Sequence, residues 1–197
     1  QPDTTYTLDR LELGQVYYWR IDEVNGAPDF AVFPGPVWSF TVEPACYPVS
    51  SDRITITASG QGSPNEGPEK AIDGSGLDED GNHSQEISEM WRSADSDPGQ
   101  SWIQLDLDQV EKLSGMRVWN HNTALESVVG YGIKEALIEY SPDGIAWSEF
   151  GVVELAQAPG TADYQGVEIS LEGIVARSVR ITANSNWTSL GLKIGRA

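Results

Sequence analysis

The sequence has few basic residues, and this shortage restricts the partners it can bind. Among 197 residues there are 12 Lys and Arg against 30 Asp and Glu, which gives a formal net charge of −18 at pH 7. A surface this negative repels phosphate backbones and anionic lipid headgroups. We therefore expect neither nucleic-acid binding nor membrane insertion. A neutral partner, a cation such as Ca²⁺ or a salty extracellular setting suits the charge better.

Cysteine and long hydrophobic runs are also scarce. Cys46 is the single cysteine, so neither an intramolecular disulfide nor a Cys-rich metal site can form. No stretch approaches the run of about 18 apolar residues that a membrane helix requires. The chain begins at Gln1 without a signal peptide, and we interpret it as a processed or excised piece of a longer protein.

Catalytic groups are equally sparse. The sequence has two histidines and one cysteine, and their positions do not suggest a nucleophile with a base and an orienting group. Carboxylates are abundant, but in so acidic a chain their abundance does not indicate a glycosidase pair. A Gly-rich phosphate loop and a His-x-x-x-His metal pair are both missing. The sequence therefore predicts a protein that is not an enzyme.

The abundant residues are those that build and separate β-strands. The 20 glycines and 11 prolines stand between short runs rich in Val, Ile, Thr, Trp and Tyr. In residues 52–197 we expect eight strands and no long helix, which predicts an all-β fold, an antiparallel β-sandwich. The expected strands are Ile54–Ala58, Trp102–Leu107, Gly115–Asn120, Glu135–Ser141, Ala146–Phe150, Val167–Leu171, Ser178–Ala183 and Leu190–Ile194.

Residues 1–44 carry a separate hairpin pattern. Strands are expected at residues 15–24 and 37–42, with a loop rich in Gly and Pro between them. In the first strand, Tyr17 and Trp19 belong to a mostly apolar face. Two prolines close together mark the following residues, 45–51, as a linker.

A tyrosine-corner motif stands at the start of this hairpin. The spacing Leu11-x-x-Gly14-x-x-Tyr17 is typical of a tyrosine whose hydroxyl bonds to upstream backbone at the edge of a sandwich. The region resembles the C-terminal part of a fibronectin type III domain. A complete immunoglobulin-like sandwich needs about 100 residues, so we expect a partial immunoglobulin-like β unit. Its missing strands were cut away, or are supplied by the second region or by another chain.

The second region carries six motifs in a fixed order. They are Ala71-Ile-Asp-Gly74, Glu89-Met-Trp91, Trp102-Ile-Gln-Leu-Asp-Leu107, Gly115-Met-Arg-Val-Trp-Asn120, Ile138-Glu-Tyr-Ser-Pro-Asp-Gly144 with Trp147, and Ala176-Arg-Ser-Val-Arg-Ile-Thr182. In this order they resemble a discoidin domain, of the coagulation factor type C family, which has a galactose-binding-like jelly-roll fold. The resemblance implies a binding module whose loops at one end hold a sugar or a surface. It also implies that Trp91, Trp102 and Trp147 pack in the core.

Acidic residues gather where the resemblance implies a structural Ca²⁺ ion. Residues 66–111 contain 13 acidic and two basic side chains. Calcium takes about six to eight oxygen ligands. The resemblance matches Asp73 with the family's metal-binding aspartate, and we expect Asp78 and Glu89 to be further ligands. However, Glu89 stands where threonine is usual, and Lys193-Ile194 replaces a closing acidic residue; the alternative is a solvated acidic loop.

Sugar recognition needs an aromatic ring that stacks on the sugar and polar side chains that reach its hydroxyls. Residues of these types occur on the predicted loops, where strand ends are expected to converge. For the two histidines a surface or turn role is the alternative to ligand contact, and for Trp187 the alternative is packing in the core. The candidates are His83, Arg92, His121, Asn122, Asn184, Asn186 and Trp187.

Two functions of different classes follow. The first is a non-catalytic, calcium-stabilised module of a larger secreted or surface protein, which binds a glycan or polysaccharide and serves in adhesion outside the cell. The second is a structural subunit of a cell-surface layer or filament. It is suggested by the incomplete N-terminal unit, whose unpaired strand edges an identical chain or another domain of the parent protein can complete.

Overall fold

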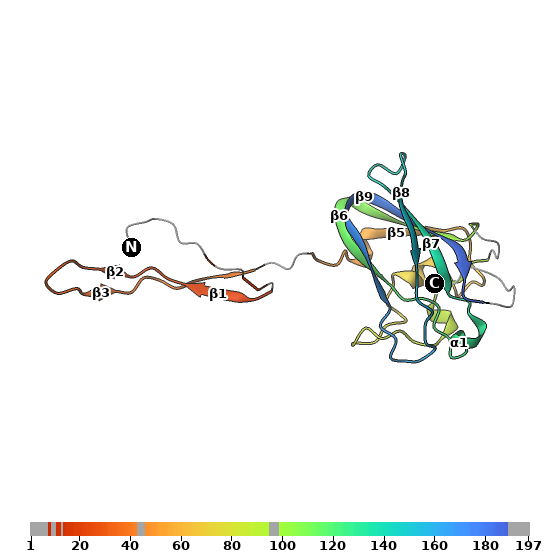
Figure 1. The fold of residues 1–197 in the computed structure, drawn as a ribbon, viewed down its shortest axis with the longest axis horizontal. Helices are drawn as coiled ribbons and strands as arrows, with labels where there is room; N and C mark the ends of the chain where they lie inside the picture. The colour runs from red at the N-terminus through yellow and green to blue at the C-terminus, as the bar shows by residue number, and fades with distance from the viewer. Residues whose placement is uncertain (1–7, 9–10, 13, 43–45, 95–98, 189–197) are drawn as a thin grey trace. The chain divides into compact units, whose positions relative to one another are not determined.

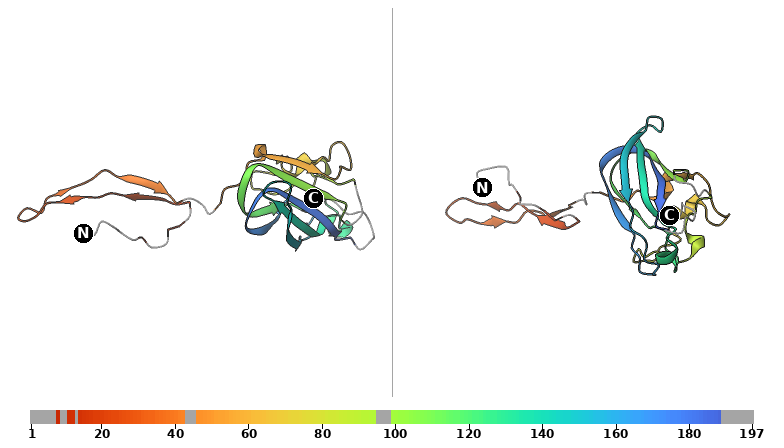
Figure 2. Two further views of the ribbon diagram at one scale, coloured as in Figure 1. Left: turned by 90° about the horizontal axis from the view of Figure 1, so that it is seen from above. Right: turned by 45° about the vertical axis from the view of Figure 1, so that its right-hand side comes forward.

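The computed structural model describes residues 8, 11–12, 14–42, 46–94 and 99–188 (Figures 1 and 2). The chain divides into two compact units, Gln1–Pro48 and Val49–Ala197, and the division falls inside the expected linker. Regular structure in the described residues is nearly all β, as expected. No helix in those residues is long and apolar enough to cross a membrane.

In its described residues, the N-terminal unit contains two antiparallel ribbons of two strands each. They pair β1 (Val16–Trp19) with β4 (Trp38–Thr41) and β2 (Glu23–Val24) with β3 (Val32–Phe33). Aromatic pairs face each other across the first ribbon, with ring centroids 5.9 Å apart for Tyr17 and Phe40 and 4.7 Å apart for Trp19 and Trp38. Such cross-strand pairs are the main side-chain stabilisation of a ribbon.

The tyrosine corner is present in this unit. The Tyr17 hydroxyl accepts a hydrogen bond from the Glu12 N–H at 3.0 Å. Many large apolar side chains of the unit remain exposed, including Tyr18 at 73% and Phe33 at 55%. A two-stranded ribbon is only marginally stable in water, so these side chains do not form a core within the described part of the unit. The relation to fibronectin type III stays a prediction.

The C-terminal unit is built on one five-stranded antiparallel sheet that curls around its core. In spatial order its strands are β5 (Ile54–Ala58), β6 (Trp102–Val118), β9 (Val167–Asn186), β7 (Ile133–Ser141) and β8 (Ser148–Glu154). The short helices are η1 (Ser51–Arg53), η2 (Pro68–Ala71), η3 (Ile87–Glu89) and α1 (Glu126–Val129).

Two long strands replace four of the expected short ones. Trp102–Leu107 and most of Gly115–Asn120 form β6, whereas Val167–Leu171 and Ser178–Ala183 form β9. The register between β6 and β9 shifts between Asp106 and Glu111 and again between Leu113 and Gly115. Bulges of this kind bend strands, so both strands curve around the core (Figure 1). Leu190–Ile194 lies outside the described residues.

The core lies under β6, β7 and β9. Alternate residues point inward, as the period of a strand requires, and burying each aliphatic side chain is worth about 1.5–3 kcal/mol. The buried members are Ile133, Ala136, Ile138, Leu155, Ile169, Leu171, Ala176, Val179 and Ala183. Trp91 is also buried, as expected, and its Nε1 donates a hydrogen bond to the Gly60 carbonyl at 3.0 Å.

Trp102 and Trp147 do not occupy the core positions expected for them, and both are only partly buried. The guanidinium of Arg180 lies 5.1 Å from the Trp102 ring centroid and 4.4 Å from that of Trp147. Trp102 is followed by Ile103, which points into the core, so the tryptophan is on the outer face. The two rings therefore pack on an arginine there, in cation–π contacts.

Candidate functional site

Loops from distant parts of the sequence meet around His83. The His83 N–H donates to the Tyr164 carbonyl at 2.7 Å, and His83 forms isolated β-bridges with both Leu77 and Tyr164. The side chain of Tyr164 lies in the interior here, and this burial raises the pKa of its hydroxyl. The loop that contains His83 is therefore fixed by backbone pairing on two sides.

Asn122 holds these loops together from inside. Its Nδ2 donates to the carbonyls of His83 at 3.0 Å and Thr161 at 2.8 Å, while its Oδ1 accepts from the Gly160 N–H at 3.0 Å. The side chain is fully buried. Asn122 is therefore not available for the sugar contact expected of it, because buried backbone groups take up the hydrogen bonds of its amide.

Asn120 has the same role, and the sequence reasoning missed it. Its Nδ2 donates to the carbonyls of Ile133 at 2.7 Å and Ala156 at 3.0 Å, and its Oδ1 accepts from the Ile133 N–H at 2.8 Å. The one available signal was the Asn-x-Asn spacing directly after a strand, which puts both amides on one side of extended chain.

His121 is also buried, so it is not on the surface where a sugar contact was expected. Its Nδ1 lies 2.5 Å from Oε2 of Glu126, and Oε1 of the same carboxylate accepts from the Gly132 N–H at 2.8 Å. His121 is 1% exposed and Glu126 is 0% exposed. This imidazole–carboxylate pair fixes α1 and the chain after it against the end of the sandwich.

His83 is buried as well, but it borders a cavity. Its Nδ1 is 2.8 Å from the Ser84 carbonyl, which only accepts hydrogen bonds. The proton is therefore on Nδ1, and Nε2 carries a lone pair. Burial lowers the pKa of His83, which favours the neutral ring. His83 thus lies beneath the surface rather than on an exposed loop.

Arg92 forms an ion pair with Glu66, a residue of the same loop region. Its guanidinium contacts the carboxylate of Glu66, which is 9% exposed. The Arg92 N–H donates to the Glu66 carbonyl at 3.2 Å, and the Arg92 carbonyl accepts from the Gly62 N–H at 2.7 Å. These contacts give Arg92 a structural role and link it to none of the other sugar-binding candidates.

Trp187 is a partly exposed residue whose indole has defined contacts. The side chain is partly buried, and its Nε1 donates to the Leu155 carbonyl at 3.0 Å. The ammonium of Lys134 lies 5.0 Å from the ring centroid. Gly130, with φ of 63°, allows the chain after α1 to approach Trp187 closely, because a Cβ there would lie 2.6 Å from the Trp187 carbonyl carbon. The indole is therefore held by its N–H, and the residue stays partly exposed.

Asn184 and Asn186 precede Trp187 at the end of β9, and both are partly exposed. Asn184 is the extra residue of a bulge, since Ala183 and Ser185 pair with consecutive residues of β7. The Asn186 Oδ1 accepts from the Thr188 N–H at 3.2 Å. The structure therefore brings these two amides and Trp187 together on one strand end.

The three predicted calcium ligands do not form one site. In the described part of the chain, no group of three or more His, Cys, Asp or Glu side chains is placed to hold a metal ion. Asp73 instead accepts from the Ser75 N–H at 2.8 Å and from the Lys70 ammonium at 3.0 Å. Burial opposes ionisation of Asp73, but these bonds outweigh it and lower the pKa of the carboxyl.

Asp78 and Glu89 are also used locally. Asp78 accepts from the side chain and N–H of Asn82 and from the N–H of Asp80, which lower the pKa of Asp78. Glu89 accepts from the Ser84 hydroxyl at 2.5 Å. The three carboxylates are therefore used separately in local contacts, and calcium binding stays a prediction. Lys193-Ile194 lies outside the described residues.

A comparison with protein-family models matched the F5/8 type C domain to residues 55–194. The chain belongs to the F5/8 type C family. A comparison with curated proteins found no match. Among solved structures, this F5/8 type C domain is similar to CBM32-3 from a family 31 glycoside hydrolase of Clostridium perfringens, with 22% identity and a TM-score of 0.51, covering 70% of this chain and 85% of the other.

Two further structures show the same F5/8 type C fold. An F5/8 type C domain from Bacteroides fragilis has 18% identity and a TM-score of 0.51, covering 76% of this chain and 90% of the other. A family 89 glycoside hydrolase from Clostridium perfringens in complex with PUGNAc has 21% identity and a TM-score of 0.51 over 71% of this chain. The chain spans only 13% of that hydrolase.

Within this F5/8 type C domain, the seven sugar-binding candidates thus fall into two groups. Four of them, His83, Arg92, His121 and Asn122, are engaged in internal contacts. The other three gather at the end of β9. The candidate surface is therefore the β9 end, which we define as Asn184, Asn186 and Trp187.

Proposed function

We propose that this F5/8 type C domain is a non-catalytic carbohydrate-binding module of a larger secreted or surface protein. The observation that carries the proposal is the Trp187 ring, which is anchored by its indole N–H and partly exposed at the β9 end. The fold supports it, because the similar structures CBM32-3 and CBM32-1 are modules of a family 31 glycoside hydrolase from Clostridium perfringens.

In the proposed complex, the sugar stacks its apolar face on Trp187. The Lys134 ammonium lies against one side of the ring, so the sugar takes the other. Asn184 has no hydrogen-bond partner for its amide in the described part of the chain, and this amide bonds to sugar hydroxyls. Since the net charge is −18, neutral glycans bind better than acidic polysaccharides.

We expect Trp187→Ala to weaken binding to a neutral galactose-type glycan at least about 10-fold, because stacking is worth about 0.5–1.5 kcal/mol beyond buried area. Affinity electrophoresis against galactose-containing polysaccharides measures the loss. Trp187→Phe keeps a ring and is expected to lose less. Trp147→Ala is the matched control, since Trp147 lies on the outer sheet face. Equal retardation of Trp187→Ala and the native protein would contradict the proposal.

The same assay tests whether calcium affects glycan binding, although the proposed stacking on Trp187 does not involve the ion. Parallel gels that contain Ca²⁺ or EDTA compare the native protein in both conditions. A difference between them would show that calcium stabilises the domain or supports glycan binding. The proposed stacking on Trp187 does not require the ion.

A second candidate function is supported by the N-terminal unit. Its large exposed apolar side chains, among them Tyr18 and Phe33, favour a structural subunit that assembles with identical chains or other domains. Sedimentation velocity over a range of protein concentrations separates the two functions. A mass that stays monomeric argues against assembly.

A further inference from the structure

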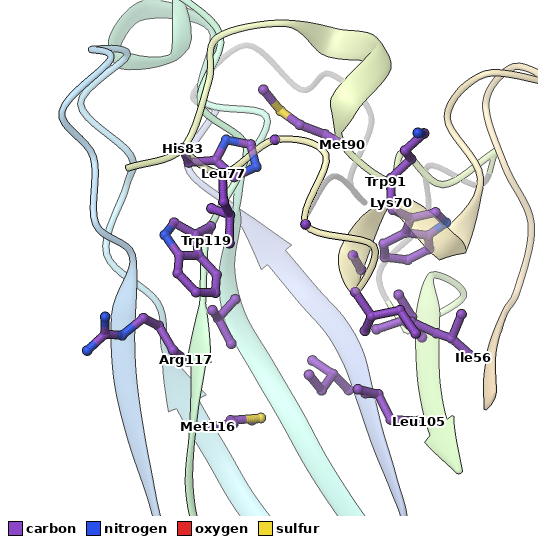
Figure 3. Close-up of a pocket in the computed structure, with 17 residues that line it drawn as sticks. Ile56, Lys70, Leu77, His83, Met90, Trp91, Leu105, Met116, Arg117 and Trp119 are labelled. Carbon is purple, nitrogen blue, oxygen red and sulfur yellow. The ribbon is translucent and has the colours of Figure 1, made fainter. Parts of the chain in front are cut away.

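A cavity of about 250 Å³ lies within the F5/8 type C domain, and none of the residues of the β9 end lines it (Figure 3). It separates the inward face of β5, β6 and β9 from the loops that cover them. Figure 3 shows His83 and Trp119 on one side and Trp91 and Ile56 on the other. Its sheet side is formed mainly by Ile56, Ile103, Leu105, Met116, Val118 and Ile181.

The cavity leaves inward-facing apolar side chains without full packing. Ile56, Leu105 and Met116 are only partly buried, although they face the interior. Ala136 and Ile138, at equivalent inward positions of β7, are 0% exposed. Protein interiors are normally close-packed, so a molecule that filled this space would gain apolar contacts now missing.

One polar group in the cavity wall has an unused atom. His83 is 7% exposed, and its Nδ1 proton is directed to the Ser84 carbonyl at 2.8 Å. Its Nε2 lies beside Gly76, where a Cβ would approach it to 3.0 Å. In the described part of the chain, Nε2 has no hydrogen-bond partner. The lowered pKa of the ring keeps this atom an acceptor at neutral pH.

The charged groups in the wall are already paired. The Lys70 ammonium is 3.0 Å from the Asp73 carboxylate, and Arg117 contacts Glu168. A charged ligand would have to break these pairs. A sugar is unsuitable too, because most of its hydroxyls would be buried against apolar walls without partners.

We propose that this cavity binds a small uncharged molecule with an apolar body and one hydrogen-bond donor, of the phenol class. The apolar body contacts the side chains of Ile56, Leu105 and Ile181, and the hydroxyl donates to Nε2 of His83. The site is independent of the β9 end, so its occupancy does not depend on glycan binding.

The test uses NMR titration of the full chain with 4-methylphenol and with toluene. Methyl resonances of Ile56 and Leu105 are expected to shift in a saturable manner. Toluene has the same apolar body without the donor, so we expect 4-methylphenol to bind about 10-fold more tightly. Absence of saturable binding overturns the proposal. Equal affinities overturn the assigned role of His83.

A variant that fills the cavity locates the site. Leu105→Phe is expected to weaken binding of both probes at least 10-fold. Val110→Phe adds a larger side chain to the same strand at a position that is 48% exposed, and it is expected to bind as the native chain does. A folded Leu105→Phe protein with native affinity overturns the proposal. If Leu105→Phe does not fold, nuclear Overhauser effects between 4-methylphenol and the native Ile56 methyls decide the location.

Discussion

Glu126→Ala is expected to lower the free energy of unfolding of the C-terminal unit by about 3–5 kcal/mol, the usual cost of removing one partner of a buried pair. The carboxylate is 0% exposed and receives hydrogen bonds at 2.5 Å from His121 and at 2.8 Å from the Gly132 N–H. Removing it leaves an imidazole and an N–H buried without an acceptor. Native domains are stable by about 5–15 kcal/mol, so this one contact accounts for a large share.

Urea unfolding followed by tryptophan fluorescence measures the effect. Glu126→Gln keeps an oxygen that accepts from Gly132 and is expected to lose less than Glu126→Ala. Glu154→Ala is the matched control, because Glu154 is an exposed residue of β8 and should change stability by under about 0.5 kcal/mol. A Glu126→Ala protein within 1 kcal/mol of native would show that the pair does not stabilise the fold.

The strands were the most predictable part of the fold because their signal is local. In Trp102–Leu107, for example, Ile103 and Leu107 alternate with polar residues and are indeed buried. The continuity of β6 was not predictable in the same way. Separate strands were expected to end at Leu107 and to begin at Gly115, but the chain continues between them as one strand with a register shift after Asp106. The strand it pairs with there, β9, is far away in the sequence.

The candidate site was predicted less well. A polar side chain that follows a strand can either contact a ligand at the surface or form hydrogen bonds between buried loops, and the sequence does not distinguish the two. His121 and Asn122 were named as candidates for sugar contact because the partners that bury them could not be identified from the sequence. For Asn122 those partners are carbonyls of His83 and Thr161, 39 residues away on either side. Asp78 was different: its bonds to Asp80 and Asn82 are within the local turn, and aspartate commonly makes such turns.

Asn122→Ala is expected to lower the free energy of unfolding by about 2–4 kcal/mol, because it leaves several buried backbone groups without partners. The carbonyls of His83 and Thr161 lose a donor, and the Gly160 N–H loses its acceptor. Denaturant unfolding measures the total change in the free energy of unfolding. Hydrogen exchange of the Gly160 amide, expected to accelerate at least 10-fold, shows that the loss is at this junction.

Asn184→Ala is the matched control for the Asn122 variant and distinguishes a structural amide from a ligand-binding one. The Asn184 amide has no hydrogen-bond partner in the described residues, so its removal should leave stability within about 0.5 kcal/mol of native while weakening glycan binding. Asn122→Ala should do the opposite when binding is measured where the variant is folded. If Asn122→Ala instead removed glycan binding at native stability, the ligand-binding role first expected from the sequence would be correct and the internal one wrong.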